Sequence, residues 1–553
     1  MSFDPRKLAR PEIVAIEPYR SAAVEEASRA GYVRLDANEN PYPPLIEEDW
    51  IADVNRYGAQ QPPALIRRLA DLYDCAPEGI VAGRGADELI DLLIRVFCAP
   101  GRDSVIICPP CFSYYETAAR QNGVGVEKAP LIDAVRLDGA AIRAAVQKTR
   151  AKIVFLCTPN NPTGAPLPHA DILDLARALD DALIVVDEAY VEFGARPSLS
   201  RALAAHPNLV VLRTLSKAYG LAGARLGASL SSPEIAGLLK KLLAPYPIPS
   251  PVAALAMKAL DPIRMPIIRR RIEEIRAARE ALARDLASSP DVERIYPSEA
   301  NFLLIRVRNA AETMARLRAA GLLARDRSSE IENCIRISIG APEENDVLRA
   351  AYGLAGEAPR PRRRAAIVRE TKETRLVAEI DLDRASPVEI DTGLPFFDHM
   401  LEQIARHGGL SLILSGRGDI EVEAHHLIED SMLTIGAALR EALGDRRGLA
   451  RFGFVAPMDE AEAAVSIDLS GRPFAKFEGD LPPGEINGFP IEMTPHAFRS
   501  LADALGAAIH IRVTGENAHH MVEICFKALG RALRQAICVG VDQEIPSTKG
   551  RIS

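Results

Sequence analysis

Two short stretches near the C-terminus repeat one pattern of residue types that bind metals. The sequence reads AHHLIED at 424–430 and AHHMVEI at 518–524. Each stretch has two adjacent histidines and a glutamate three positions after the second, in a chain of 553 residues with only 10 histidines. Mixed imidazole and carboxylate ligands suit Mn, Fe, Co or Zn. The repeat predicts metal chemistry; buried structural histidines or a single zinc are the alternatives.

The helix period divides each doublet between two ions. Helical patterns follow both doublets, at 427–442 and 521–536. If each doublet begins its helix, His425 and Glu429 are i and i+4 and point the same way. His426 is then turned by about 100° from His425. Two adjacent histidines therefore cannot easily chelate one ion, but they can serve two different ions.

Each half of this region offers one further histidine. His399 in FFDHMLEQIARHGG and His496 in EMTPHAFRSLADALG occupy equivalent places upstream of the doublets. Divided by the duplication, each ion would have three histidines and one glutamate, which leaves positions for water or substrate. The candidate ligands are His399, His425, His426, Glu429, His496, His519, His520 and Glu523.

A second set of candidate residues lies between residues 50 and 350. RGADE (84–88) opens an expected helix, whose backbone N–H groups could receive a phosphate. TPNNPTG (158–164) follows an apolar run, VVDEAY (185–190) ends another, and TLSKAYGLAGARLG (214–227) places a lysine just beyond a third. Ligands of open α/β sheets bind at these carboxyl ends of strands. The order predicts one site built from several strand ends.

Two different patterns of apolar residues position these sets. Up to about residue 350, continuous apolar runs such as KIVFLCTP alternate with helical patterns, which predicts a parallel sheet covered on both faces. GEAPRPRRRAA (356–366) reads as a linker. Alternating stretches such as GDIEVEAHH then predict an α+β domain with an internal duplication. The expected domains are therefore 1–355 and 367–553.

Composition narrows the class of protein. The formal net charge of −8 argues against a nucleic-acid partner. The longest uncharged stretch, 242–257, contains four prolines, and the N-terminal residues have no apolar signal core, so we expect neither a membrane span nor export. Eight scattered cysteines fit a reducing cytoplasm.

The N-terminal motifs together resemble the fold-type I aminotransferases that use pyridoxal 5'-phosphate. LDANENPYP, NRYGAQQP and GRGADELIDLLIRVFC extend the resemblance over residues 10–352, most closely to histidinol-phosphate aminotransferases. It implies an α/β fold with a mostly parallel central sheet and a small α+β lobe. It also implies a dimer, in which Tyr57 reaches the cofactor phosphate of the other subunit.

The resemblance assigns a role to each motif. Lys217 would bond to the cofactor and shuttle the proton, and Asp187 would pair with the pyridine nitrogen. Asn161 and Tyr190 would hydrogen-bond the ring hydroxyl. The cofactor phosphate would be held by Ala86, Asp87, Ser216 and Arg225. The implied substrate-binding residues are Tyr19, Asn38, Arg325 and Arg336.

One position departs from this family. PPCF places Phe112 where a tyrosine usually stacks on the cofactor ring. Stacking needs only the π face and is kept, whereas a hydrogen bond from a phenol is lost.

The segment 367–553 resembles imidazoleglycerol-phosphate dehydratases, through TKETR, GLPFFDHMLEQIARHGG, HHLIED, SGRP, HHMVE and PSTKG. This family implies two Mn²⁺ per site and a shell of 24 subunits with the metals between them. Two metals would bind the imidazole nitrogens and ease loss of a C–H proton. Glu373 is the implied acid and base. The candidates for the substrate phosphate are Arg451, Arg472, Lys527, Ser547 and Lys549.

The two resemblances are consecutive in chemistry. The dehydratase would make imidazole acetol phosphate from imidazole glycerol phosphate, and the aminotransferase would convert that ketone, with glutamate, to histidinol phosphate. The sequence thus predicts a bifunctional enzyme of histidine biosynthesis. The alternatives are another aminotransferase specificity, such as an aromatic amino acid, beside a metal-binding module, or a non-catalytic regulator or metal store.

Overall fold

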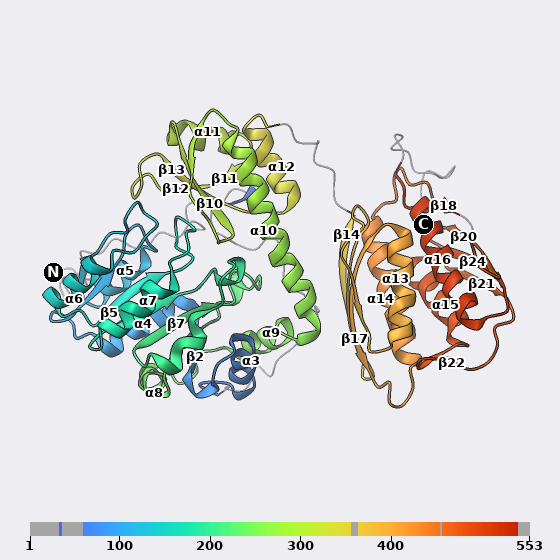
Figure 1. Ribbon diagram of the computed structural model, residues 1–553, viewed down its shortest axis with the longest axis horizontal. Coiled ribbons are helices and arrows are strands. Elements are labelled where there is room, and N and C mark those ends of the chain that lie inside the picture. The colour runs from blue at the N-terminus through green and yellow to red at the C-terminus, as the bar shows by residue number, and fades with distance from the viewer. Residues whose placement is uncertain (1–32, 36–58, 355–362, 454–455, 540–553) are drawn as a thin grey trace, which may run out of the picture. The chain divides into compact units, whose positions relative to one another are not determined.

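The computed structural model describes residues 33–35, 59–354, 363–453 and 456–539 (Figure 1). The chain divides into two compact units. The first contains the described residues up to Leu260 and those from Ile268 to Leu354. The second contains Asp261–Ile267 and the described residues from Arg363 onward.

The first unit is built on a seven-stranded sheet. The strand order is β2 (Ile80–Gly83), β8 (Gly227–Leu230), β7 (Leu209–Thr214), β6 (Leu183–Asp187), β5 (Ile153–Cys157), β3 (Ser104–Ile107) and β4 (Gly125–Lys128). Neighbours from β7 to β4 are parallel, and only β8 runs against its neighbours. The expected mostly parallel sheet is therefore confirmed.

Two groups of helices pack on this sheet. Helix α4 (Gly85–Phe97) contacts α5 (Tyr114–Gln121) and α8 (Pro233–Leu242), whereas α6 (Gly139–Thr149) contacts α7 (His169–Ala178). Strands β2, β5, β7 and β8 are buried along their whole length. Continuous apolar runs are what such doubly covered strands require.

A smaller lobe completes the first unit. Its antiparallel sheet has the order β12 (Arg325–Asp326), β13 (Cys334–Ser338), β10 (Phe302–Val307) and β9 (Val292–Ile295). The lobe also contains α11 (Ala310–Ala319) and α12 (Pro342–Ala351), and the long helix α10 (Met265–Ala287) leads into it (Figure 1). The remaining helices named in Figure 1 for this unit are α3 (Pro63–Tyr73) and α9 (Ser250–Ala259).

The second unit repeats one order of elements twice. The first half has β14 (Arg364–Glu370), β15 (Thr374–Asp381), β16 (Val388–Asp391), α13 (Pro395–Gly408), β17 (Ser411–Gly418) and α14 (His425–Leu443). The second half has β18 (Phe452–Gly453), β19 (Ala456–Met458), β20 (Ala461–Asp468), β21 (Phe474–Glu478), α15 (Met493–Leu505), β24 (Ala508–Thr514) and α16 (Ala518–Ala536), with an additional pair of short strands, β22 (Glu485–Ile486) and β23 (Phe489–Pro490), before α15. In both halves the final strand pairs antiparallel on one side and parallel on the other. The predicted internal duplication is confirmed.

The helices of the two halves pack crosswise between the two sheets. Helix α14 packs on α15 and α13 packs on α16, and Figure 1 shows these helices inside with a sheet on either side. One core of apolar side chains runs through both halves. Each doublet helix therefore meets the helix of the other half that carries the additional histidine.

Strand β14 begins inside the segment predicted as a linker. Its first three residues, 364–366, are the last three of the predicted linker 356–366. These three residues pair with β15 in an antiparallel register, and Ala365 is buried. The prediction was wrong for these three residues because a run of arginines does not prevent strand pairing at a sheet edge. Residues 356–362 lie outside the described part.

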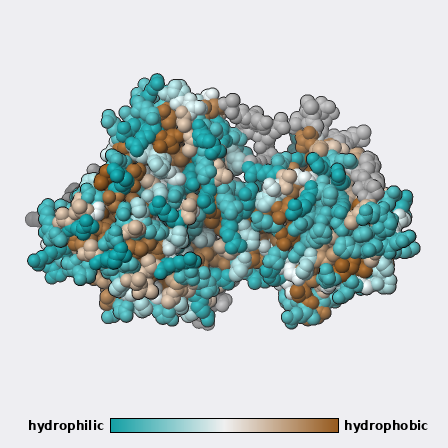
Figure 2. Space-filling view, viewed as in Figure 1, coloured by the Kyte–Doolittle hydropathy of each residue, from teal (hydrophilic) through white to brown (hydrophobic). Residues whose placement is uncertain are grey.

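The surface in view mixes hydrophilic residues with small hydrophobic patches (Figure 2). Among the described residues, no helix is both long and apolar enough to cross a membrane.

A buried ion-pair network joins the ends of β6 and β7. The Arg213 side chain is 6% exposed, and its guanidinium lies 2.6 Å from Glu192 and 3.7 Å from Glu188. Glu188 is fully buried and also accepts hydrogen bonds from Ser198 and from the Leu199 N–H. Removing one partner of such a pair leaves a buried charge without compensation.

We expect Arg213→Met to destabilise the first unit by about 3–5 kcal/mol, because Glu188 and Glu192 would lose their counter-charge. Calorimetry should show a lower transition temperature for this unit. Arg201→Met is the control, because it breaks an ion pair with Asp74 in which both side chains are at least 70% exposed. Equal shifts in the two variants would contradict the argument.

Candidate functional site

The first candidate site lies at the carboxyl ends of β5, β6 and β7. Asn161 follows β5, Asp187 is the last residue of β6, and Lys217 follows β7 by three residues. Because these strands are adjacent and parallel, their ends lie on one edge of the sheet. The fold thus brings the predicted motifs to one place.

Asp187 is a buried carboxylate at the centre of this edge. The Tyr115 hydroxyl donates to its Oδ2 at 2.7 Å, and the Ala189 N–H donates to Oδ1 at 3.1 Å. Burial raises the pKa of Asp187 to about 6, against the opposing effect of these hydrogen bonds and of Lys217. A buried carboxylate of this kind favours a cation beside it.

Lys217 and Tyr190 lie next to each other. The Lys217 ammonium is 5.9 Å from the centre of the Tyr190 ring. Tyr190 is buried and stands edge-on to Phe302 of β10, at 5.1 Å between ring centres. The small lobe therefore fixes the ring that the lysine faces.

Two arginines of the small lobe, Arg325 and Arg336, lie opposite each other on paired strands. Arg336 of β13 donates to Asn161 Oδ1 at 2.7 Å, and Arg325 is its direct partner across the β12–β13 pair. Burial, with the neighbouring cationic Arg327 and Arg325, lowers the pKa of Arg336 to about 10, against the opposing effect of Tyr190 and Glu330. Bringing an anion to this cluster would compensate both the burial and the repulsion.

The first backbone N–H groups of α4 have no partner within the helix, as at any helix start. Arg225 lies over this helix start, with Nη2 at 2.8 Å from the Asp87 carboxylate. Gly85 has φ +81°, and a Cβ there would come within 2.8 Å of Arg225 Nη2. A Cβ at Gly227 would come within 2.8 Å of the Ala86 nitrogen. Close approach therefore requires glycine at both positions, as in sites where a phosphate meets backbone.

The remaining predicted residues of this site have other contacts or fall outside the description. The buried Ser216 hydroxyl accepts from Thr214 at 3.0 Å. The Phe112 ring stands edge-on to Tyr115, at 5.6 Å between centres. Tyr19, Asn38 and Tyr57 lie outside the described residues.

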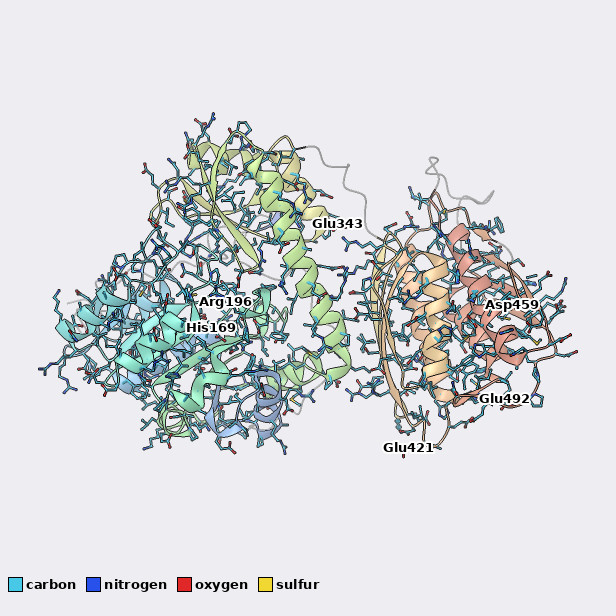
Figure 3. All side chains as sticks on the ribbon, viewed as in Figure 1. His169, Arg196, Glu343, Glu421, Asp459 and Glu492 are labelled. Carbon is cyan, nitrogen blue, oxygen red and sulfur yellow. The ribbon has the colours of Figure 1, made fainter. Side chains whose placement is uncertain are left out.

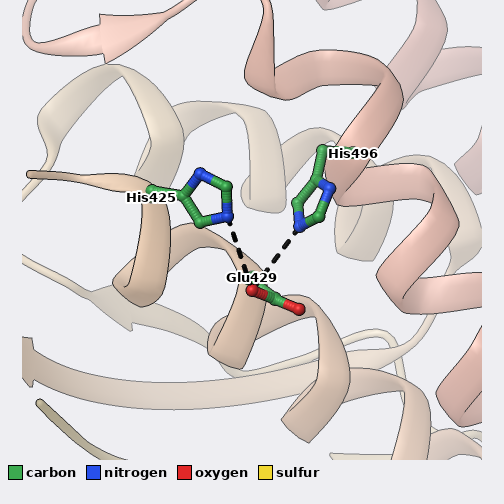
Figure 4. A group of neighbouring side chains, drawn as sticks. All are labelled: His425, Glu429 and His496. Carbon is green, nitrogen blue, oxygen red and sulfur yellow. Dashed lines mark ion pairs between the residues drawn. The ribbon is translucent and has the colours of Figure 1, made fainter.

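The second unit brings two sets of metal-binding side chains together across its halves. In the first set, Nε2 of His425 and Nε2 of His496 each lie 3.5 Å from Glu429 Oε2 (Figure 4). His425 and Glu429 come from α14 and His496 comes from α15. The three ligand atoms lie within 4.8 Å of one another.

The distances in this first set fit one metal ion bound by all three side chains. His496 Nε2 is buried and has no hydrogen-bond partner among the described residues. A separation of 3.5 Å is too long for a good hydrogen bond. Two ligands that each lie about 2.1 Å from one metal ion are roughly 3.0–3.5 Å apart. The donors present therefore fit a transition-metal ion.

The second set repeats the first with the halves exchanged. His519 Nε2 lies 3.2 Å and His399 Nε2 3.6 Å from the two oxygens of Glu523. Lys527 also contacts Glu523, at 2.7 Å. Burial of Glu523 acts to raise its pKa, but Lys527 and the two histidines outweigh that and lower it. The carboxylate therefore stays ionised, as a metal ligand must be.

The second histidine of each doublet points elsewhere. His426 Nδ1 is 3.8 Å from Glu373, and His520 Nδ1 is 2.9 Å from Glu460. Within one chain each set thus contains two histidines and one glutamate. The second histidine of each doublet is kept out of the set by the 100° turn between adjacent helical residues, and the expected third histidine per ion stays a prediction.

The residues predicted to bind the substrate phosphate in this unit have different partners. Arg451 makes a two-pronged pair with Asp468, at 2.6 and 3.0 Å. Arg472 is exposed just beyond β20, and Lys527 lies beside Glu523. Ser547 and Lys549 lie outside the described residues.

Two residues with contacts to these sites were missed in the sequence. Tyr115 donates to Asp187, and nothing in its local pattern indicates that partner. Glu460 contacts His520, and it lies next to Asp459, which Figure 3 labels in the second unit. Superposing the two halves could have found Glu460, because it immediately precedes β20 as Glu373 precedes the equivalent β15.

Comparison with known proteins agrees with this division. Residues 30–351 match the family model described as aminotransferase class I and II, and residues 392–533 match that described as imidazoleglycerol-phosphate dehydratase. The chain is 43% identical over 350 residues to histidinol-phosphate aminotransferase of Stenotrophomonas maltophilia, which covers 62% of this chain and 95% of that protein. The Aeromonas hydrophila protein of the same name is 40% identical over 348 residues, which covers 62% and 96%.

Solved structures show the same relationship for the first unit. Histidinol-phosphate aminotransferase from Sinorhizobium meliloti, in complex with pyridoxal-5'-phosphate, has a TM-score of 0.56 and 28% identity, covering 62% of this chain and 95% of that one. An aspartate aminotransferase mutant from Thermus thermophilus shares the fold, with a TM-score of 0.52 and 22% identity, covering 62% and 98%. The chain therefore belongs to the aminotransferase class I and II family through its first unit, and its second unit contains an imidazoleglycerol-phosphate dehydratase domain.

Proposed function

We propose that this chain is a bifunctional enzyme of histidine biosynthesis. The second unit dehydrates imidazole glycerol phosphate to imidazole acetol phosphate. The first unit transaminates that ketone with glutamate and yields histidinol phosphate. The observation that carries the proposal is that one chain holds both a lysine–carboxylate site at the strand ends and two His–Glu–His sets.

The first unit has the side chains that pyridoxal phosphate needs. That cofactor supplies an electron sink for the carbon that exchanges its amino group. Asp187 would hold the pyridine nitrogen in its protonated form, which relieves the cost of burying this carboxylate. Lys217 would carry the covalent bond and move the proton. The α4 backbone at Ala86 and Asp87, with Ser216 and Arg225, would hold the phosphate.

The small lobe would bind the anionic end of the substrate. Arg336 lies beside Asn161 and opposite Arg325. Arginine forks suit carboxylate and phosphate oxygens. Tyr19, Asn38 and, from a partner subunit, Tyr57 would complete this site, so the aminotransferase would act as a dimer.

The second unit would use Mn²⁺ at two positions. The two sets lie in equivalent places of the two halves, and each leaves coordination positions open. His426 and His520 point away from the sets of their own chain, so each would complete the site of another copy in a shell of 24 subunits. Glu373 would act as acid and base, and Arg451, Arg472, Lys527, Ser547 and Lys549 would hold the substrate phosphate.

The proposal requires only that imidazole acetol phosphate, made by the second unit, reach the site of the first unit. The eight cysteines are all free thiols, which supports a reducing cytoplasm as the compartment.

The two activities should fail separately. Lys217→Ala should abolish transamination and leave dehydration intact, because only the first site loses its nucleophile. His425→Ala should abolish dehydration and leave transamination of added imidazole acetol phosphate intact. A coupled assay with imidazole glycerol phosphate, glutamate and Mn²⁺ measures both steps, and a chelator should reproduce the His425→Ala result. If either variant lost both activities, the assignment of one reaction to each unit would be wrong.

Asp187→Asn should stabilise the cofactor-free first unit while impairing transamination. The folded pKa of about 6 lies above the ordinary value of 3.8, so the folded state favours the protonated carboxyl. The stability penalty is therefore fully present above about pH 6 and disappears as the pH falls toward 4. The difference corresponds to about 3 kcal/mol.

Thermal unfolding of the cofactor-free chain at pH 7.5 and pH 5 measures this effect. Asp181→Asn is the control, because Asp181 is exposed in the turn before β6. A gain in melting temperature for Asp187→Asn that is the same at both pH values would contradict the assignment to this carboxyl group.

A further inference from the structure

The two doublets lie at the start of equivalent helices, but the second histidine of each doublet has different surroundings. Glu373 lies in the turn before β15 and Glu460 in the turn before β20, and these strands are equivalent in the duplication. Each glutamate faces Nδ1 of the second histidine in its half. The duplication therefore produces the same carboxylate–imidazole pair twice.

The two pairs differ in the distance between the carboxylate oxygens and the imidazole nitrogen. Glu373 Oε2 is 3.8 Å from His426 Nδ1, beyond hydrogen-bond range, and both side chains are about half exposed. Glu460 Oε1 and Oε2 are 3.1 and 2.9 Å from His520 Nδ1, within hydrogen-bond range, and both side chains are about one-third exposed. Only the second pair is held as a hydrogen bond.

Additional hydrogen bonds fix Glu460 to the start of α16. The Asn517 N–H donates to Glu460 Oε1 at 3.1 Å. The Asn517 side chain accepts from the N–H groups of His519 and His520 at 2.9 and 3.4 Å. In the first half the residue equivalent to Asn517 is Glu423, and the N-cap of α14 is Ala424, which has no capping side chain. Among the described contacts, a side chain therefore caps the N–H groups of the second doublet but not those of the first.

The hydrogen bond also decides which ring nitrogen of His520 can bind a metal. An ionised carboxylate only accepts, so Nδ1 must carry the proton. Nε2 then has the free lone pair and points away from Glu460. Carboxylates that orient metal-binding histidines in this way commonly change metal affinity by 10–100-fold.

We propose that Glu460 is a positioning residue for metal binding, which sets the tautomer and direction of His520 while Glu373 stays free for proton transfer. The proposal rests on the proposed function, because that assigns His520 as a metal ligand. It goes further in giving the two equivalent glutamates different roles: a tight pair orients a ligand, and a loose pair leaves its carboxylate available to the substrate.

The test measures Mn²⁺ binding to the full-length chain by equilibrium dialysis and by the electron paramagnetic resonance signal of the ion. Glu460→Ala should weaken one class of Mn²⁺ sites by about 10–100-fold. Glu460→Gln should restore most of the affinity, because its amide oxygen still accepts from Nδ1–H. An unchanged thermal unfolding transition of the second unit in both variants shows that this unit is folded.

Asp459→Asn is the matched control. It removes the same charge from the adjacent residue, and asparagine suits the left-handed conformation there, φ 48°. Its Mn²⁺ affinity should equal that of the wild type. An equal loss in Asp459→Asn and Glu460→Ala would overturn the proposal, because the acidic turn itself would then bind the ion.

His520→Ala separates this inference from the function on which it depends. If His520→Ala weakens Mn²⁺ binding and Glu460→Ala does not, the positioning role is wrong and the ligand set stands. If His520→Ala leaves Mn²⁺ binding unchanged, His520 is no ligand, and the ligand set and the positioning role are both wrong.

Discussion

The second unit depends on the angle between neighbouring residues of an α-helix. Side chains four positions apart share a face, so His425 points with Glu429 and His519 with Glu523. The next residue along is turned by about 100° and cannot join the same ion. The two histidines of one doublet therefore point to two different positions. Because the fold is duplicated, the second doublet repeats this arrangement in the other half.

Crosswise packing then supplies the missing ligands. A doublet helix alone offers one histidine and one glutamate, which is too few to hold an ion. Because α14 packs on α15 and α13 on α16, each pair gains a histidine from the opposite half. The apolar core that joins the halves is thus also what assembles each metal-binding set.

The first unit is marked by charged side chains that are buried inside the protein. Asp187 is buried with Tyr115 and the Ala189 N–H as its donors, and Arg336 is buried beside Asn161. Burial shifts the pKa of each group toward its neutral form. Each group is best compensated by a ligand of opposite charge, which is what the proposed function would supply: a cationic ring beside Asp187 and an anionic substrate beside Arg336.

Local features of both units could be predicted from the sequence. Continuous apolar runs require burial on both faces, which fixed the parallel sheet and placed Asp187 and Lys217 at strand ends. The i and i+4 spacing fixed the histidine–glutamate pairs. These follow from backbone geometry within a few residues. The positions of Tyr57 and Ser547, by contrast, stay predictions.

Only the tertiary structure decided the long-range partners. No spacing in the sequence indicates that Tyr115 donates to Asp187, 72 residues away, or that Glu460 holds His520, 60 residues away. It also showed which carboxylate His426 faces, because Glu373 in the turn before β15 meets this histidine only where α14 packs on that strand. Backbone periodicity determines which side chains of a segment share a face. The packing of apolar faces determines which distant residues those side chains contact.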